Sequence, residues 1–507
     1  MSDAFWLIGL ILAPVFTGLA CLIARGARAC ERINAMGALV TLGLSVAVVA
    51  RIIKDGAFDS VRGLLYVDAF SGLMIASIGL VGFAGSMISI PFIRTENDRG
   101  AVPQRDRGVR LYYAGIHALI ATMYFTVSVD NLGLLWVGIE ATTVASALLV
   151  GFSRKRAALD AAWKYLILCT VGITCALFGV LLTYFAARIG SGNGSLDWSS
   201  LAGPTGTLDP DLMRLAFVFI LVGLGTKAGF APLHTWMADA YGQAPSPVAG
   251  MLSGVLSSVA LYGILRFHTL TTMATGTQFS GNLLLGFGLF SVLIALPFIV
   301  LARDLKRLFA FSSVEHMGLM AIAFGIGGPL GVTAGLFHLA NHAATKAFLF
   351  FVAGSIRQRY GTRRIAAIRG MLRVEPVLGW MLVAGVLAIT GTPPFGIFVS
   401  EFSIVSAGFH GDRWEIAASI VIVLLIGVIF AGFMRHLIGM SYGIAGNNPD
   451  RFAGITPAWK SRAGIAAFVP LLIVMVWFGV HVPEPIRDLF NEIAAIIEPA
   501  SREVAAR

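Results

Sequence analysis

Long apolar stretches recur from one end of this 507-residue chain to the other. A stretch of about 18 or more such residues is long enough to cross a hydrocarbon core of roughly 30 Å as a helix. The composition agrees, because 57% of the residues are hydrophobic and only 13% are charged, whereas a soluble domain carries about 25% charged residues. The sequence therefore predicts an all-α polytopic membrane protein.

The basic residues predict an orientation for the spans. Loops after the odd-numbered spans hold most of the Lys and Arg, including a run of arginines from 357 to 373. Positive charge marks the cytoplasmic side, so we expect a multi-pass protein of the prokaryotic cytoplasmic (inner) membrane with both termini on the periplasmic or outer side. Placed in short loops, the net charge of +10 indicates topology and no nucleic-acid partner. We expect fourteen spans that begin near residues 5, 34, 69, 112, 130, 163, 213, 246, 280, 306, 331, 376, 415 and 463.

A faint repeat links the sixth and eleventh spans. Ala161–Lys164 and Ala343–Lys346 share the pattern Ala-Ala-x-Lys at an offset of 182 residues. Five spans separate the copies, so they cross the membrane in opposite directions, as in the inverted repeats of many transporters. A chance match in apolar sequence is the alternative. The expected units are the first three helices, two five-helix repeats, and the last helix with a tail, at 1–110, 111–275, 276–440 and 441–507.

Prolines interrupt two spans that again lie five apart. Pro232 falls in the seventh span, and Pro393 and Pro394 fall in the twelfth. Proline removes a backbone donor from a helix, and in a membrane such a break persists where it is buried in protein or lines a wet cavity. These breaks predict the transport site, although two simple kinks would give the same pattern.

Ionisable residues inside apolar spans are costly, about 2.5–3.5 kcal/mol each at a helix centre, and mark functional sites. Glu140 and Lys227 form the natural pair, and a buried lysine whose carboxylate partner moves can release and regain a proton. A static ion pair between two helices is the alternative. Lys164, Lys346 and Glu401 also lie within spans.

Four histidines lie in or near spans, at His234, His316, His338 and His342. Histidine suits proton relay, since its ordinary pKa of about 6.5 is close to neutrality. His338, His342 and Lys346 are spaced four residues apart and share one helix face. We expect these residues, with Glu140, Lys164, Lys227 and Glu401, to form a proton pathway, and we expect no metal site and no catalytic residue.

The four cysteines form no CxxC pair or cluster-binding spacing. We therefore expect no cofactor in this chain. If electrons drive it, they flow in another subunit.

Several motifs resemble the antiporter-like membrane subunits of respiratory complex I, multisubunit (Mrp-type) cation/proton antiporters and group 4 nickel–iron hydrogenases. They are WVGIEATT around Glu140, AAWKYLI around Lys164, TKAGFAPLHTWMADAYGQAPSP around Lys227, FSSVEHMGLM around His316, HLANHAATKAFLFFVAG around Lys346 and GTPPFGIFVSEF around Glu401. Within this family, EHMG, NHAATK and YGTRRIAAIRGMLRVEP look most like component F of hydrogenase-4 and formate-hydrogenlyase complexes.

The resemblance implies fourteen helices with two inverted five-helix repeats, discontinuous helices 7 and 12, and a central hydrophilic axis. It implies that Glu140 pairs with Lys227 and that Glu401 stands at the far end. Ser258 departs from the pattern, because many complex I relatives carry a lysine there. Water or His316 would then have to bridge the middle of the axis.

These observations favour a non-catalytic, proton-translocating subunit of a hydrogenase-type or NADH dehydrogenase-like oxidoreductase complex. Its partners would be the lipid bilayer, protons, and membrane and peripheral subunits. A nickel–iron centre and iron–sulfur clusters would lie in those partner subunits. Three alternatives stay open: the membrane subunit of an inorganic-carbon uptake complex with a soluble zinc partner, a cation/proton antiporter subunit, and a non-conducting scaffold.

Overall fold

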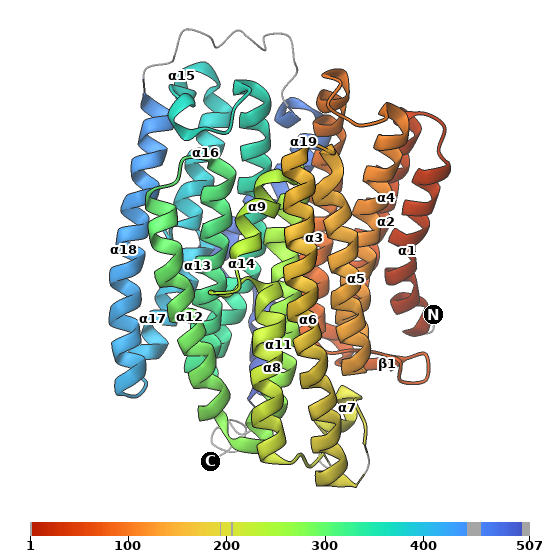
Figure 1. The fold of residues 1–507 in the computed structure, drawn as a ribbon, viewed down its shortest axis with the longest axis vertical. Helices are drawn as coiled ribbons and strands as arrows, with labels where there is room; N and C mark the ends of the chain where they lie inside the picture. Colours follow the sequence, from red (N-terminus) through yellow and green to blue (C-terminus); the bar gives the residue numbers. More distant parts are fainter. Residues whose placement is uncertain (1–2, 193, 204–205, 444–457, 499–507) are drawn as a thin grey trace.

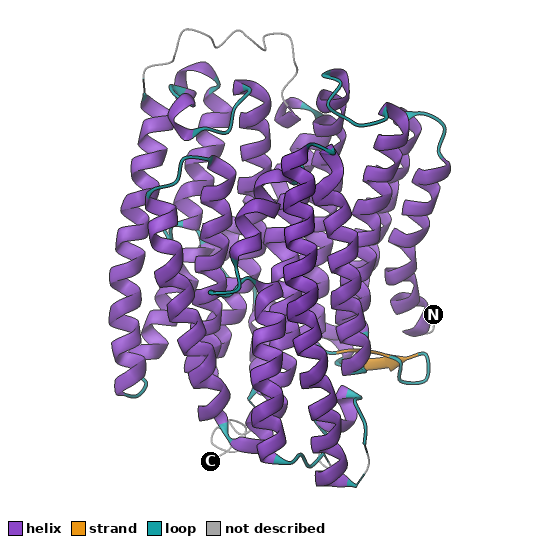
Figure 2. Cartoon of the chain, viewed as in Figure 1, coloured by secondary structure: helices purple, strands orange, loops and turns teal. Residues whose placement is uncertain are grey.

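The helices of the protein run nearly parallel to one long axis, and a computed structural model describes residues 3–192, 194–203, 206–443 and 458–498 (Figure 1). Figure 2 shows that helix dominates the described chain and that strand is confined to one hairpin at the lower end. The hairpin pairs β1 (Phe58–Ser60) with β2 (Leu65–Val67) in antiparallel register. The prediction of an all-α membrane fold is confirmed, with this hairpin as a small addition.

Within the described residues, ten helical segments are long and apolar enough to cross a membrane. One of them joins α10 to α11 through a π-helical turn at Leu252–Leu256. The ten are α1 (Asp3–Ile23), α2 (Ala27–Asp55), α3 (Ala69–Asp98), α5 (Leu132–Val150), α6 (Arg156–Ser191), α10 (Ser246–Met251) with α11 (Ser257–Thr275), α12 (Thr277–Val300), α13 (Leu305–Ile326), α18 (Arg413–Tyr442) and α19 (Arg462–Val480).

The other four expected spans correspond to helices that are shorter or more polar. Two of these spans are broken, since α8 is followed by α9 and α16 by α17. Each break falls at the predicted prolines, so the expected discontinuities are confirmed. The helices are α4 (Arg105–Ser128), α8 (Pro210–Ala228), α9 (Thr235–Gln243), α14 (Gly328–Tyr360), α16 (Pro376–Ile389) and α17 (Gly396–Phe409).

Short elements close the ends of the bundle. They are α7 (Trp198–Leu201), α15 (Met371–Val374), and single 3₁₀ turns at Gly151–Ser153, Ile365–Ala367 and Ala458–Lys460. A further helix, α20 (Glu484–Ile497), follows the last span and packs against α14 and α3. A packed helix here goes beyond the tail that the sequence predicts after the last span.

Side-chain caps explain where several spans begin. Asp68, Asn131, Asp209, Asp304 and Asp412 each accept a hydrogen bond from a backbone N–H of the first helical turn. These N–H groups have no partner within the helix, and Asp or Asn at this position satisfies them. The capping residue at the end of each preceding loop therefore fixes where the helix begins.

Helices near the centre are buried almost throughout, and outer helices bury only one face. Polar residues of α3, α11, α13 and α14 are therefore enclosed by protein. Arg266 on α11 forms a two-pronged ion pair with Asp68 at the start of α3, with both N–O distances at 2.7 Å. The pair is buried and holds these two central helices in register.

Candidate functional site

The first buried lysine lies in the last turn of α8, just before the helix break. Lys227 is 1% exposed, and its Nζ donates to Thr143 Oγ1 at 2.9 Å and to Tyr165 Oη at 2.5 Å. Tyr165 Oη is also 2.7 Å from Ser146 Oγ on α5. A buried ammonium needs such acceptors, and here neutral hydroxyl groups of α5 and α6 supply them.

Glu140 lies on the same helix as Thr143 but does not bind Lys227. Its Oε1 accepts a hydrogen bond from Thr170 Oγ1 at 2.9 Å, and Oε2 is buried without a hydrogen bond. The described residues show no Glu140–Lys227 ion pair within 4.0 Å. The expected pair is therefore not in direct contact in this conformation, in which Thr143, about one helical turn further along α5, accepts the hydrogen bond from the ammonium.

Lys164 does not belong to the buried axis. Its side chain is 63% exposed and contacts Asp239 Oδ2 at 3.3 Å, while Arg307 lies 3.6 Å from the other carboxylate oxygen. Tyr165, the next residue on α6, is the one that points inward to Lys227. The prediction that Lys164 lines the buried path is wrong because α6 turns this position outward.

The break between α8 and α9 lies in the middle of the bundle, with α9 continuing toward the upper end in Figure 1. Backbone groups freed by the break are satisfied by side chains: Ala231 N–H donates to Ser291 Oγ at 2.9 Å, and Trp236 Nε1 donates to Thr226 O at 2.8 Å. Pro232 lies within this break. His234 follows it, nearly buried, with Nδ1 unbonded and its ring against Phe311. No hydrogen bond in the described chain joins His234 to either buried lysine.

Serine and tyrosine hydroxyls fill the centre, between the two breaks. Ser253 Oγ and Ser313 Oγ are 2.7 Å apart, and Tyr241 Oη is 2.9 Å from Ser257 Oγ. Ser258 is buried and bonds only to Gly254 O within its own helix, at 3.3 Å. The centre is thus polar and enclosed, although Ser258 supplies no titratable group.

The second buried lysine lies on α14. Lys346 is fully buried, and its Nζ donates to Ser312 Oγ at 2.8 Å and to Phe309 O at 3.3 Å. Both acceptors belong to α13. As at Lys227, a hydroxyl and not a carboxylate holds the ammonium.

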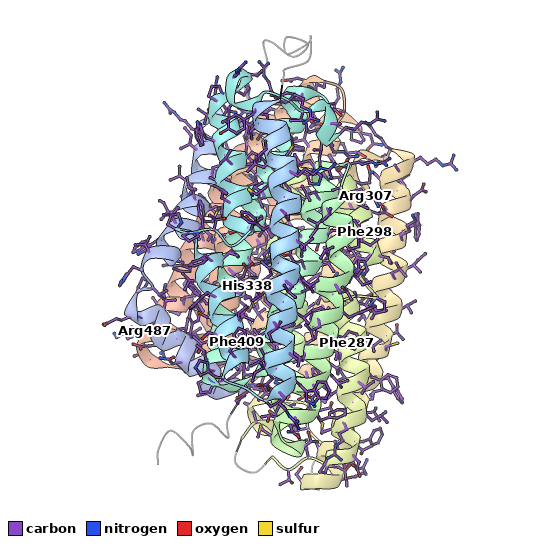
Figure 3. All side chains as sticks on the ribbon, turned by 90° about the vertical axis from the view of Figure 1, so that its left-hand side faces the viewer. Phe287, Phe298, Arg307, His338, Phe409 and Arg487 are labelled. Carbon is purple, nitrogen blue, oxygen red and sulfur yellow. The ribbon has the colours of Figure 1, made fainter. Side chains whose placement is uncertain are left out.

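Three buried histidines continue from Lys346 toward the second break. His316 Nδ1 is 3.0 Å from His338 Nε2, and His338 Nδ1 is 2.9 Å from Ser400 Oγ. The ring of His342 lies 5.6 Å from that of His316, and both its nitrogens are buried without hydrogen bonds. Figure 3 places His338 about midway along the bundle.

Glu401 closes this row at the second break. Its Oε1 is 4.0 Å from His316 Nδ1, and its side chain is 9% exposed. Gly391, just before Pro393 and Pro394, has φ +60°, and a Cβ there would lie 2.1 Å from Glu401 Oε2. Only glycine allows the carboxylate to approach the broken backbone this closely.

Sequence reasoning missed two buried charged residues on α13. Glu315 is 3% exposed and precedes His316 in the EHMG motif, so its position beside a named histidine was the available signal. Lys306 is 1% exposed, and its Nζ donates to the carbonyl oxygen of Ala244, the residue directly after α9, at 2.6 Å. Its position at the predicted start of a span makes it indistinguishable, from sequence, from the basic residues of the preceding loop.

A polar cavity of about 620 Å³ is lined by residues around Lys306, although Lys306 itself is not part of its wall. Its walls include Gln243 and Pro245, which flank the carbonyl that Lys306 binds, and Asp304, two residues before the lysine. Figure 3 shows Arg307, the next residue, near the upper end of the bundle. Lys306 therefore lies near this cavity, in the first turn of the helix that carries the buried Ser312 and Ser313. In the described part of the chain, no group of three or more His, Cys, Asp or Glu could hold a metal ion.

Comparisons with known proteins agree with this arrangement. Residues 129–427, more than half of the chain, match the family described as NADH:quinone oxidoreductase/Mrp antiporter, transmembrane. A hydrogenase-4 component F homolog from Methylacidiphilum infernorum is 38% identical over 445 residues, which cover 87% of this chain and 90% of the relative. Subunit N of an NADH-quinone oxidoreductase from Desulforudis audaxviator is 29% identical, with 72% and 70% coverage.

The same fold occurs in a chain of an archaeal respiratory membrane complex, the membrane-bound sulfane sulfur reductase. The TM-score is 0.83 at 24% sequence identity, and the alignment covers 99% of both chains. The fold, the family match and the 38% identical relative lead to one conclusion. The chain belongs to the NADH:quinone oxidoreductase/Mrp antiporter family of membrane subunits.

Proposed function

We propose that this chain is the proton-translocating membrane subunit of a hydrogenase-type or complex I-like redox complex. The observation that carries the proposal is the row of buried ionisable groups enclosed between two broken helices. Lys227 and Lys346 are both fully enclosed and held by hydroxyl groups. Ionisable residues inside a membrane protein mark ion and proton paths. The similarity to a hydrogenase-4 component F homolog favours this type of complex.

In the proposed path, a change of charge near Glu140 alters the free energy of the protonated form of Lys227. In the structure the Lys227 ammonium is bound by the hydroxyl groups of Thr143 and Tyr165, and the Glu140 carboxylate is not in contact with it. Movement of the Glu140 carboxylate from Thr170 toward Lys227 would stabilise the ammonium, and its return would favour proton release.

The centre of the path consists of hydroxyl groups and the water they would bind. The Ser253–Ser313 and Tyr241–Ser257 contacts lie on the elements between the two lysines. Hydroxyl groups both donate and accept hydrogen bonds, so they can order a chain of water where Ser258 replaces the lysine of many relatives. From Lys346 the proposed row continues through His342 and His316 to Glu401, with His338 hydrogen-bonded to His316.

Lys306 extends the proposal to the end of α13. The polar cavity beside it connects to the side on which the basic loops lie, which we propose is the cytoplasm. On α13 the buried Ser312 and Ser313 follow Lys306 by six and seven residues, a rise of about 10 Å. Lys306 is thus positioned to take up protons from the cavity and pass them through water toward Lys346.

The proposal also covers the membrane orientation, the partner subunits and the location of any metal centre. The termini would lie on the periplasmic side, the partners would be further membrane and peripheral subunits, and any nickel–iron or iron–sulfur centre would lie in those partners. The four cysteines are free thiols, and Cys21 and Cys30 lie side by side, each Sγ donating to the other's carbonyl oxygen at 3.8 and 3.7 Å.

The Lys227→Ala variant of the assembled complex tests this function. We expect loss of redox-driven acidification in membrane vesicles, with the partner subunits still present in the purified complex. Lys164→Ala serves as the control, because Lys164 is an exposed lysine of the same family motifs. Intact pumping in Lys227→Ala would contradict the proposal. Co-purification with a soluble zinc protein and no redox subunit would instead favour inorganic-carbon uptake.

A further inference from the structure

A basic cavity lies far from the buried axis, among the ends of three helices. It has a volume of about 340 Å³ and opens between α2, α3 and α19. Four arginines and one glutamate supply its charges, so the lining carries an excess of positive charge. The polar residues lining it are Arg28, Glu31, Arg32, Arg94, Ser461 and Arg462.

One of these arginines is fixed and three are free to bind a ligand. Arg94 forms a two-pronged contact with Glu31, at 2.8 Å from Nε and 2.5 Å from the second nitrogen, and the carboxylate is buried. Arg28, Arg32 and Arg462 make no hydrogen bond or ion pair with any described residue. Glu31 therefore neutralises one arginine and leaves three uncompensated charges around the cavity.

Exposed apolar residues continue from the arginines of α2 and α19 along the outer side of each helix. On α2, Arg32 is followed on the same face by Met36, Leu39 and Val40, which are 62%, 54% and 52% exposed. Residues four, seven and eight positions apart lie on one side of a helix. The apolar stripe of α2 therefore begins at the basic cavity.

A second helix repeats this arrangement. On α19, Arg462 is followed by Ile465, Val469 and Ile473, which are 52%, 45% and 51% exposed. On α3, by contrast, Ile90 lies one turn before Arg94 and is only 8% exposed, so α3 adds no exposed stripe. Both α2 and α19 pack against α3, so the two exposed stripes begin at the cavity on the helices that flank α3.

We propose that this cavity binds the phosphate headgroup of an acidic phospholipid such as phosphatidylglycerol. Guanidinium groups bind phosphate through paired, charge-assisted hydrogen bonds, and basic pockets between membrane helices are suited to anionic headgroups. A free phosphate would satisfy the arginines alone. The apolar stripes below them provide contact for acyl chains, which favours the lipid as the source of the phosphate.

Binding can be measured by native mass spectrometry of the full-length chain in detergent. The probes are phosphatidylglycerol, phosphatidylcholine and inorganic phosphate. The test variant combines Arg28→Gln, Arg32→Gln and Arg462→Gln, and Arg32→Gln alone is a milder second variant. Arg25→Gln is the matched control, because Arg25 lies just before α2, three residues from Arg28, but does not line the cavity. Thermal unfolding of each variant in phosphatidylcholine confirms folding.

We expect phosphatidylglycerol to bind more tightly than phosphatidylcholine. Each arginine removed should weaken phosphatidylglycerol binding by about fivefold, and the triple substitution by roughly 100-fold. Arg25→Gln should bind as the unmodified chain does. Equal binding of the two lipids, or an unchanged affinity in the triple variant, would overturn the proposal. Displacement of phosphatidylglycerol by equimolar inorganic phosphate would overturn the lipid assignment and indicate a small-anion site.

Discussion

The two copies of the Ala-Ala-x-Lys repeat place their lysines in opposite environments. Lys164 on α6 is 63% exposed and paired with Asp239. Lys346 on α14 is fully buried and bound by Ser312 and a backbone carbonyl of α13. The first lysine lies where α6 faces outward, whereas α14 is surrounded by α3, α10, α13, α16, α17, α19 and α20.

This difference teaches that a sequence repeat reproduces a helix position but not its surroundings. The environment of Lys346 resembles that of Lys227, although Lys227 lies outside the repeated motif. Both of these lysines are enclosed, and both donate to a hydroxyl group on a neighbouring helix. A set of variants can test whether burial, and not motif membership, decides which lysine carries protons.

The largest effect is expected for Lys346→Met. Methionine fills similar space without a titratable group, so the fold should be retained and the row to Glu401 interrupted. Redox-driven proton uptake should fall by about 100-fold or more, measured by fluorescence quenching in vesicles that contain the assembled complex. Pumping near the normal rate would show that Lys346 is a structural residue.

A smaller effect is expected for Lys306→Arg. Arginine keeps the charge and can still donate to Ala244 O, but it does not release its proton. Proton translocation should fall by roughly tenfold, while the melting temperature stays close to that of the unmodified protein. A fully active Lys306→Arg variant would mean that Lys306 only anchors α13 to the end of α9.

Thr143→Val should have a moderate effect. The substitution preserves shape but removes one of the two hydroxyl acceptors of Lys227. An under-satisfied buried donor costs about 1–3 kcal/mol, so thermal unfolding in detergent should begin at a lower temperature and pumping should slow. Thr143→Ser restores the hydroxyl and should restore both. Identical behaviour of the Val and Ser variants would contradict the assigned contact.

The smallest effect is expected for Lys164→Ala. An exposed ion pair contributes only about 0.2–1 kcal/mol, and Asp239 keeps Arg307 as a neighbour. Proton uptake should stay within about twofold of the normal rate when assayed as for Lys346→Met. A loss as large as that of Lys346→Met would break the comparison and return Lys164 to the proton pathway.

The candidate site could be predicted from sequence in part. Proline placement correctly located both helix breaks, and the spacing of His338, His342 and Lys346 correctly placed them on one buried helix. Glu140 and Lys227 were correctly identified as unusual intramembrane charges, but their direct contact was not found. The roles of all these residues in transport stay predictions.

Sequence by itself determined the membrane fold, the positions of the breaks and the helix faces, because length, hydropathy and helical periodicity are local properties of the chain. Only the tertiary structure decided which charges are enclosed. The helices that surround a position decide whether it is buried. They also decide which hydroxyl group reaches each lysine ammonium. Thr143 instead of Glu140 binds Lys227, α6 turns Lys164 outward, and α9 ends against Lys306 for this reason.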